Sequence, residues 1–456
     1  MAASTIDSTL FRDQFSTPAM RAVFDDEMTV QKWLDVEAAL ARAEASLGII
    51  PEQAAKDITR AADVSQYDLD AMRDEMARTS HPIVPLVRAM AKACEKLGAK
   101  EAGEYVHWGA TTQDIMDTGL ILQMKDGLEL LQDALGVLDA NLEKLARDHR
   151  DTPMAGRTHG QQALPITFGY KAAVWLDEVR RHRARLDEMA PRVLVGQFSG
   201  AVGTYAAIGA QGPEVMARMM ADLGLTAPAI CWHVAKDRPA DFACNLALVA
   251  GTMGKIAHEV ATLQRTELAE LEEPHQPGKV GSSTMPQKRN PSICEGIQSL
   301  ARVAWACVPP AFDGMIAEHE RDKVANQGER DFIPRLCCYT EAAVRKVAFV
   351  TGGLTVRAGN MRKNLDLTGG LLLSEAVMMK LGQKIGRNTA HDVVYEAAME
   401  AFEKDLVFRD LLLKDDRVTA VMSAADLDGI LDPARYTGLS AEMVDAVLKT
   451  TKAAPS

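Results

Sequence analysis

Two long apolar stripes constrain the fold of this 456-residue chain more than any other feature. In each stripe, apolar residues recur at alternating spacings of four and three, which indicates one face of a long α-helix. The first stripe comprises Leu120, Met124, Leu128, Leu131, Leu135, Leu138, Leu142 and Leu145, and the second comprises Phe242, Leu246, Val249, Met253, Ile256, Val260 and Leu263. At 1.5 Å per residue, each helix would span roughly 40 Å or more.

Three further segments carry helical patterns, one after Pro165 and two more after Pro291 and Pro334. The first of them contains Val174, Trp175, Leu176, Val179 and Leu186. Sustained spacing near 3.5 residues is typical of near-parallel helices, so the five segments predict a bundle. Stripes this wide bury poorly in a lone five-helix unit, which favours packing against copies of the same chain.

Strand patterns are almost absent, so the sequence predicts an all-α fold. The glycine-rich stretch GAVGTYAAIGAQG at 200–212 follows no predicted strand, which argues against dinucleotide binding and for a connection between helices. Residues 1–110 and 361–456 carry shorter helical segments broken by Gly, Pro and Asn. We therefore expect three domains: a helical domain at 1–110, the central bundle at 111–360 and a second helical domain at 361–456.

Composition and charge exclude several classes of function. A net charge of −12 without a long basic run disfavours nucleic acid and anionic membranes as partners. No stretch of 18 apolar residues suggests a membrane span, and the first residues lack a signal-peptide pattern. The seven cysteines show no metal-like spacing, so we expect buried free thiols, no metal and a cytoplasmic protein.

Three polar patches interrupt the helical pattern: HWGATTQDIMDTG at 107–119, GRTHGQQALP at 156–165 and GSSTMPQKRNP at 281–291. In the third, the backbone amides of residues 281–283 beside Lys288 would suit a carboxylate or a developing oxyanion. Asn290 and Pro291 are predicted as the N-cap and first residue of the next helix. A solvated serine-rich and glycine-rich surface loop is the plainer alternative.

The other patches leave similar alternatives open. His159 stands before a segment predicted to be a proline-started helix, and a helix N-terminus would lower its pKa; a capping cluster is the alternative to a general acid or base. Thr111 and Thr112 precede the first long helix, with Asp114 and Asp117 in its first turn, where N-capping with acidic residues on the helix dipole is the alternative to ligand binding. His81 lies at a similar polar break. The charged run at 318–331 is either a solvated face or a source of anion-binding arginines.

Taken together, the patches resemble the three signature regions of the fumarase/aspartase superfamily, whose hallmark GSSxMPxKxNP is similar to GSSTMPQKRNP. The stretches QFSTPAMRAVF, EYVHWGATTQDIMDTG and NLDLTGGLLLSEAV resemble the 3-carboxy-cis,cis-muconate cycloisomerase branch, and adenylosuccinate lyases are the other near branch. The resemblance implies a homotetramer with a twenty-helix bundle, active sites built from three subunits, no cofactor, and anti elimination that releases fumarate from a small dicarboxylate-containing substrate.

The resemblance also implies roles by motif position. Ser282 would be the catalytic base, His159 the general acid, His81 a second active-site histidine and Lys288 the cation beside the base. The implied substrate-binding residues are Thr111, Thr112, Thr158, Gln161, Ser283, Thr284, Met285, Asn290, Arg321 and Arg330.

Two departures bear on the choice of branch. The cycloisomerase pattern carries a tryptophan at the position of His159, so histidine favours elimination with protonation of a leaving amine. The Arg-Tyr and Ser-Arg-Pro-Glu-Met patterns with which adenylosuccinate lyases hold phosphate are replaced by QFSTPAM at 14–20. We therefore expect a lyase that cleaves the C–N bond of an N-substituted aspartate. The alternatives are a cycloisomerase, an adenylosuccinate lyase and a catalytically silent structural protein.

Overall fold

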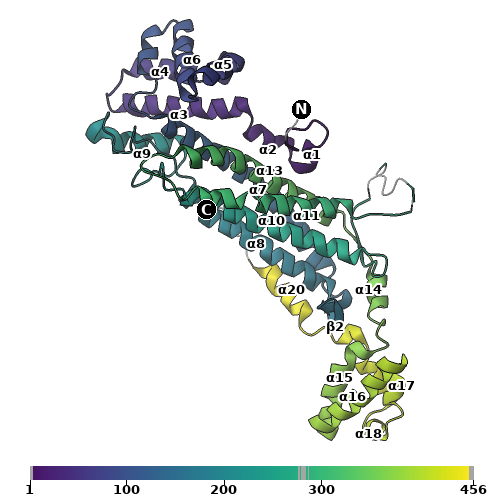
Figure 1. The fold of residues 1–456 in the computed structure, drawn as a ribbon. Helices are drawn as coiled ribbons and strands as arrows, with labels where there is room; N and C mark the ends of the chain where they lie inside the picture. The colour runs from purple at the N-terminus through teal and green to yellow at the C-terminus, as the bar shows by residue number, and fades with distance from the viewer. Residues whose placement is uncertain (1–3, 276–277, 279–283, 286, 451–456) are drawn as a thin grey trace.

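Five long helices form the middle of an elongated molecule, as the bundle prediction required (Figure 1). The computed structural model describes residues 4–275, 278, 284–285 and 287–450. The bundle helices are α7 (Thr112–Asp148), α8 (Phe168–Val193), α10 (Asp237–Leu263), α11 (Ser292–Trp305) and α13 (Lys323–Gly352). The all-α fold class is thus confirmed, because the strands of the described chain form only two small two-stranded sheets.

The two stripes are the buried faces of α7 and α10. Every member of the α10 stripe lies in the bundle core, and so does every member of the α7 stripe except Leu120, which is half-buried. In α8 the predicted core residues are likewise buried, except Val174, which is 40% exposed. The side chains on these faces leave water together, so their apolar area stabilises the bundle as one core.

Two predicted helix starts were wrong. The helix expected after Pro334 begins at Lys323 instead, because the Asp322 carboxylate accepts from the Val324 amide at 2.8 Å and caps that end. The helix expected to begin at Pro291 is α11, and it begins at Ser292 instead. The Glu273 carboxylate, rather than a cap by Asn290, accepts from two amides of its first turn.

The segment around Pro165 is a β-hairpin, and the predicted helix start there was also wrong. Strand β1 (Pro153–Thr158) pairs antiparallel with β2 (Gln161–Thr167), and Pro165 lies inside β2 opposite Ala155. The two-residue turn consists of His159 and Gly160, with φ of 54° and 79°, the positive values that a tight hairpin turn of this kind requires. A second pair joins β3 (Leu271–Glu272) to β4 (Thr355–Val356).

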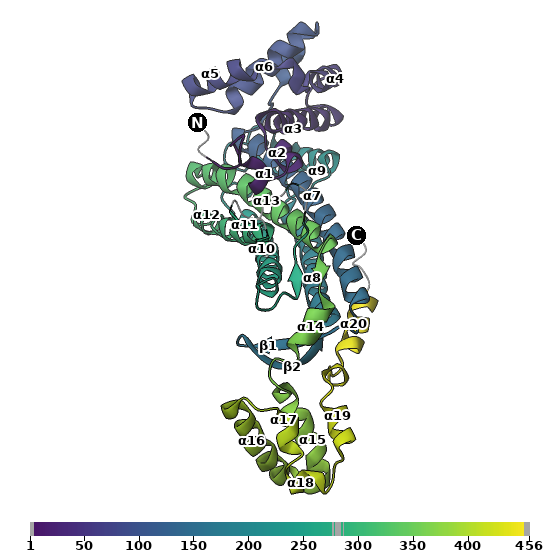
Figure 2. The ribbon, with the colours of Figure 1, turned by 90° about the vertical axis from the view of Figure 1, so that its right-hand side faces the viewer.

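Smaller groups of helices lie at either end of the bundle (Figure 2). The N-terminal group has its own core and contains α3 (Asp26–Ser46), α4 (Glu52–Ala61), α5 (Leu69–Thr79) and α6 (Ile83–Lys96), joined by α9 (Gly212–Leu223). At the other end, α15 (Ser374–Ile385), α16 (Arg387–Lys404), α17 (Phe408–Leu412), α18 (Asp416–Thr419) and α19 (Ala424–Ile430) surround another core. The remaining helices are α1 (Arg12–Phe15), α2 (Pro18–Val23), α12 (Val308–Asp313), α14 (Ala358–Asn364) and α20 (Ser440–Lys449).

Helix α20 returns from this end to pack against α8, and Val444 joins the bundle core. The last helix of the predicted third domain therefore lies along the bundle. The boundaries of the three predicted domains stay a prediction.

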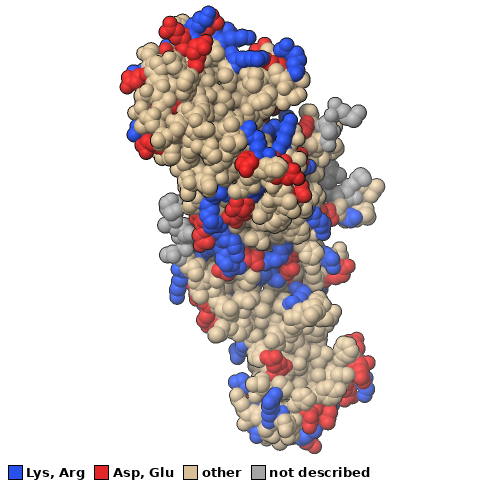
Figure 3. Space-filling view, turned by 60° about the vertical axis from the view of Figure 1, so that its left-hand side comes forward, with Lys and Arg blue, Asp and Glu red and all other residues tan. Residues whose placement is uncertain are grey.

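On the face in Figure 3, acidic and basic side chains are interspersed, without a broad area of one sign. None of the helices in the described ranges is both long and apolar enough to cross a membrane. All seven cysteines are free, but Cys231 and Cys244 are half-buried, so the expectation that every thiol is buried was wrong for these two.

Candidate active site

The N-terminal end of α7 brings together residues from separate parts of the chain. His81, just before α6, places Nε2 3.1 Å from Thr112 Oγ1. Its Nδ1 accepts from the Val84 amide at 3.3 Å, so the neutral imidazole carries its proton on Nε2 and donates to Thr112. His81 and Thr112 were both predicted site residues, and the fold places them in contact.

Arg321 joins this group from the segment before α13. Its Nη2 donates to Thr111 Oγ1 at 2.7 Å and to the carbonyl of Ala201 at 2.6 Å. A guanidinium, two threonine hydroxyls and a histidine thus meet where the helix dipole favours negative charge. Such a group is suited to a carboxylate.

A fully buried carboxylate holds this end of α7 in place. Asp114 accepts from the amide of Thr111 at 3.0 Å, as the predicted cap requires. It also accepts from the amides of Ser199 and Gly200 at 3.1 and 3.0 Å, and its Oδ1 lies 2.9 Å from His233 Nε2. Burial alone would lower the pKa of His233, but hydrogen bonds and charges of Asp114 and Cys231 outweigh it and raise the pKa to about 9.

A second buried network carries Arg330. Its Nη2 donates to Asn326 Oδ1 at 2.6 Å, and Asn326 in turn donates to Asp117 Oδ1 at 2.7 Å. Lys236 lies 3.0 Å from a Glu329 oxygen and 3.4 Å from an Asp117 oxygen. Burial raises the pKa of Glu329 to about 7, against the opposing charge of Lys236. Through Asn326 and Asp117, Arg330 is therefore held near the same end of α7 as Arg321.

The hairpin tip exposes Thr158, His159 and Gln161 to solvent. His159 lies in a β-turn, so the prediction that it stands directly before a helix N-terminus was wrong. Close to the turn, Arg157 holds the hairpin by donating to both Glu270 oxygens at 2.9 and 2.7 Å. An exposed imidazole on a braced turn is placed to reach a molecule that approaches this end from outside.

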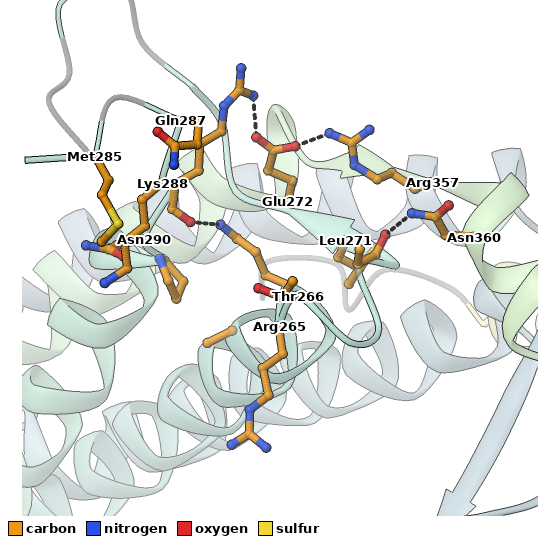
Figure 4. Close-up of a pocket in the computed structure, with 15 residues that line it drawn as sticks. Arg265, Thr266, Leu271, Glu272, Met285, Gln287, Lys288, Asn290, Arg357 and Asn360 are labelled. Carbon is orange, nitrogen blue, oxygen red and sulfur yellow. Dashed lines mark hydrogen bonds and ion pairs between the residues drawn. The ribbon is translucent and has the colours of Figure 1, made fainter. Parts of the chain in front are cut away.

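The third patch borders a cavity of about 860 Å³, which Met285, Lys288 and Asn290 line (Figure 4). Glu272 stands at its wall and accepts from Arg357 and from Arg289. Two of the predicted residues, Ser282 and Ser283, lie outside the described residues. Thr284 is described and exposed, and does not line this cavity.

The first and second patches do not meet within one chain. His81, Thr112 and Arg321 lie at the first turn of α7, whereas the hairpin begins at Pro153, just beyond the last residue of that helix. A helix of 37 residues is about 55 Å long at 1.5 Å per residue. His81 precedes α6 and His159 lies between β1 and β2, and most of the bundle separates α6 from this hairpin (Figure 2).

Sequence reasoning missed the residues beneath the site. The cap at Asp114 was predicted, whereas Asp117, predicted in the same first turn, pairs with side chains instead. The partners His233, Lys236 and Glu329 carried no local signal because they are distant in sequence. Within the described ranges, no three His, Cys, Asp or Glu side chains gather in a way that could hold a metal ion.

Comparisons with known proteins fit this arrangement. Residues 12–305 match the lyase family model, and residues 370–447 match the model of the adenylosuccinate lyase C-terminus. The N-acetyl-S-(2-succino)cysteine lyase of Enterococcus italicus is 44% identical over 98% of this chain and 97% of its own. The 3-carboxy-cis,cis-muconate cycloisomerase of Pseudomonas aeruginosa is 43% identical over 96% of this chain and 95% of its own.

Solved structures agree. The 3-carboxy-cis,cis-muconate lactonizing enzyme of Pseudomonas putida superposes with a TM-score of 0.91 at 40% identity, covering 97% of this chain and 98% of that one. The fumarate lyase of Mesorhizobium sp. BNC1 gives 0.89 at 41% identity, covering 96% and 99%. The chain belongs to the lyase family and is an enzyme of the fumarase/aspartase superfamily.

Proposed function

We propose that this enzyme releases fumarate from a 2-succinyl thioether by cleaving the bond between C2 of the succinyl group and sulfur. The observation that carries the proposal is the meeting of His81, Thr111, Thr112 and Arg321 at the N-terminus of α7. Hydroxyls, a guanidinium and a helix dipole are the groups that hold a dicarboxylate. Relatives named for a succinylated cysteine substrate, 44% and 42% identical over 98% of the chain, support the sulfur.

The chemistry is an anti elimination. A base, for which we propose Ser282, removes a proton from C3 of the succinyl group, and negative charge develops on the adjacent carboxylate. Lys288 and Asn290 are proposed to stabilise that charge. The electrons then form the double bond of fumarate as the C2–S bond breaks. The thiolate leaves with its electron pair and takes a proton, which we assign to His159.

The need for this proton donor depends on whether the leaving atom is sulfur or nitrogen. A cysteine thiol has a pKa near 8.5, so its thiolate departs readily at neutral pH, whereas an amine must be protonated as it leaves. The C–N cleavage predicted from the sequence remains the second candidate, because His159 is retained and exposed on the hairpin. If the enzyme cleaves a C–N bond, replacing His159 should lower activity far more than if it cleaves a C–S bond.

A complete site needs more than one copy of the chain, and we propose a homotetramer. The separation of His81 from His159 by most of α7 supports this arrangement, since both cannot serve one substrate within a chain. Exposed apolar residues on the bundle, such as Leu248, Trp305 and Phe312, are consistent with contacts between copies.

The test is a substrate panel. Purified enzyme is given N-acetyl-S-(2-succino)cysteine, N-substituted aspartates, adenylosuccinate and 3-carboxy-cis,cis-muconate, and fumarate or lactone is followed by absorbance and NMR. Fumarate from the thioether at kcat/KM above about 10⁴ M⁻¹s⁻¹ supports the proposal. Comparable turnover of an aspartate but not the thioether restores the C–N lyase, and lactone formation alone makes the enzyme a cycloisomerase.

A further inference from the structure

Glu270 is a fully buried carboxylate behind the hairpin that carries His159. It lies between the end of α10 and strand β3. Arg157 donates to both of its oxygens at 2.9 and 2.7 Å, which is a two-point contact with a defined direction. Asn364, the last residue of α14, donates to Oε1 of the same carboxylate at 2.8 Å. Two side chains from different elements therefore satisfy this buried charge within the fold.

Glu270 and Asn364 together support both strands of the hairpin tip. On β1, Arg157 binds Glu270, and on β2, Gln162 Nε2 donates to the Asn364 carbonyl at 2.9 Å. Arg157 and Gln162 are paired across the hairpin, one pair away from the turn. Asn364 is tied to the same segment as Glu270, because its Nδ2 also donates to the Leu268 carbonyl at 2.8 Å. The two strands therefore meet one buried support next to the turn.

The direction of His159 depends on this support. The pairing register of the hairpin shifts between Ala155 and Arg157, so only two residue pairs lie between the shift and the turn. A two-stranded ribbon this short is at best marginally stable by its own backbone hydrogen bonds. His159 is exposed, so the backbone of the turn sets where its imidazole points. The side-chain contacts of Arg157 and Gln162 are then what fix that direction.

We propose that Glu270 is a positioning residue for the elimination, which holds the turn through Arg157 so that His159 points at the leaving atom. The role rests on the proposed function, which assigns the proton of the leaving group to His159. Because Glu270 is buried, it acts through the hairpin and not by contact with the substrate. A proton donor must lie within about 2.6 to 3.2 Å of the group that it protonates. A displacement of the tip by about 1 Å would therefore weaken proton transfer.

Buried ion pairs of this kind also bear on the stability of a fold, and kinetics separate the two roles. If Glu270 acts through His159, it has nothing to position once the imidazole is gone. Replacing Glu270 should then lower kcat only while His159 is present, because effects of residues that act as a unit are not additive. If Glu270 serves the fold alone, the loss should be the same with and without His159.

The experiment is a double-mutant cycle on the full-length enzyme with Glu270→Gln, His159→Ala and the double variant. Glutamine keeps the size of the side chain but has one oxygen acceptor, so the two-point contact with Arg157 is lost. Steady-state kinetics use the thioether, or an N-substituted aspartate if the wild type turns over only that compound. We expect Glu270→Gln alone to lower kcat roughly 10- to 100-fold with a smaller change in KM. In the His159→Ala background, the same substitution should lower kcat by no more than about twofold.

Two further variants complete the design. Glu267→Gln, which changes an exposed carboxylate in the same segment, should leave kcat and KM near wild type. Arg157→Lys keeps the ion pair but replaces the guanidinium fork by a single ammonium group, so it should repeat the kinetic pattern of Glu270→Gln in a milder form. Because Arg157→Lys leaves no buried charge without a partner, its cycle with His159→Ala decides the question if Glu270→Gln does not fold.

An equal loss of kcat with and without His159, or no loss in either background, would overturn the positioning role. A His159→Ala variant as active as the wild type would overturn it as well. Turnover of the thioether together with equal losses refutes the role of Glu270 and keeps the proposed function. Turnover of an aspartate alone, with the effect of Glu270→Gln confined to enzyme that has His159, refutes the thioether and keeps the role.

Discussion

Asp114 and His233 form a buried ion pair, with Oδ1 and Nε2 2.9 Å apart, although 119 positions separate them in the chain. Through the same carboxylate, the amides of Thr111, Ser199 and Gly200 are tied to the first turn of α7. One side chain thus fixes the helix end that carries Thr112 and the loop that Arg321 contacts.

Replacing Asp114 by Asn should therefore destabilise the fold and abolish turnover. The variant leaves the His233 charge without its partner and turns an amide donor towards backbone N–H groups. Breaking a buried pair in this way costs about 3 to 5 kcal/mol. Urea unfolding of the variant against the wild type measures the loss.

The control is Asp148→Asn at the other end of α7, where the carboxylate pairs with Lys144 at the surface. Its unfolding free energy should stay close to that of the wild type, because an exposed ion pair contributes little to stability. Equal effects of the two substitutions would show that the buried pair does not hold the helix end.

Glu44 makes the stability of the N-terminal group depend on pH. It is fully buried, and neither of its oxygens has a hydrogen-bond partner among the described residues. Burial, with a smaller effect of Glu37, raises the pKa of Glu44 from 4.5 to about 9. The folded state keeps the proton that the unfolded state releases above pH 4.5, so stability falls as pH rises from 4.5 towards 9.

Glu44→Gln should remove that dependence. Relative to wild type, the variant should gain stability between pH 5 and pH 8, with a slope of up to about 1.4 kcal/mol per pH unit. Urea unfolding at both pH values tests this, with Glu52→Gln on the exposed start of α4 as the control. A difference between Glu44→Gln and wild type that is constant with pH would contradict a protonated Glu44.

The sequence predicted what is periodic or local. The stripes from Met124 to Leu145 and from Phe242 to Leu263 predicted the bundle, because apolar residues on one face of a helix recur at a fixed spacing in the sequence. The cap at Asp114 was predicted as well, because the residues of a helix cap are only three positions apart in the sequence. The resemblance of the patches to the fumarase/aspartase signatures then supplied the family.

The features that the sequence did not predict depend on contacts between residues that are far apart in the chain. The hairpin at 153–167 is braced by Glu270, and its turn needs a positive φ at His159, which few residues other than glycine adopt readily. Because proline is common in the first turn of a helix, Pro165 suggested a helix start, but it lies in strand β2 instead. The network of Asp117, Lys236 and Glu329 joins three helices whose contacts no local pattern encodes.

Glu272 is predicted to position the residues that line the cavity. It accepts from Arg289, the neighbour of Lys288, and from Arg357, which lies next to strand β4. Glu272→Ala would free Arg289, and misplacement of Lys288 and Asn290 should lower kcat roughly 10- to 100-fold with a smaller change in KM. Steady-state kinetics measure the split. Glu267→Ala, exposed in the same segment, should leave both constants near wild type, and an equal loss there would remove the role of Glu272.

The last prediction concerns the two histidines at opposite ends of α7. If each site draws His81 and His159 from different copies, His81→Ala and His159→Ala should each lose activity, by about 10²- to 10⁴-fold for a proton-transfer residue. Mixed oligomers of the two variants should contain some sites with both histidines intact. Co-refolding the variants, with native mass spectrometry to verify hybrids, should then restore activity well above either parent. Hybrids as inactive as their parents would mean that one chain supplies both histidines, which the length of α7 makes unattainable without a rearranged fold.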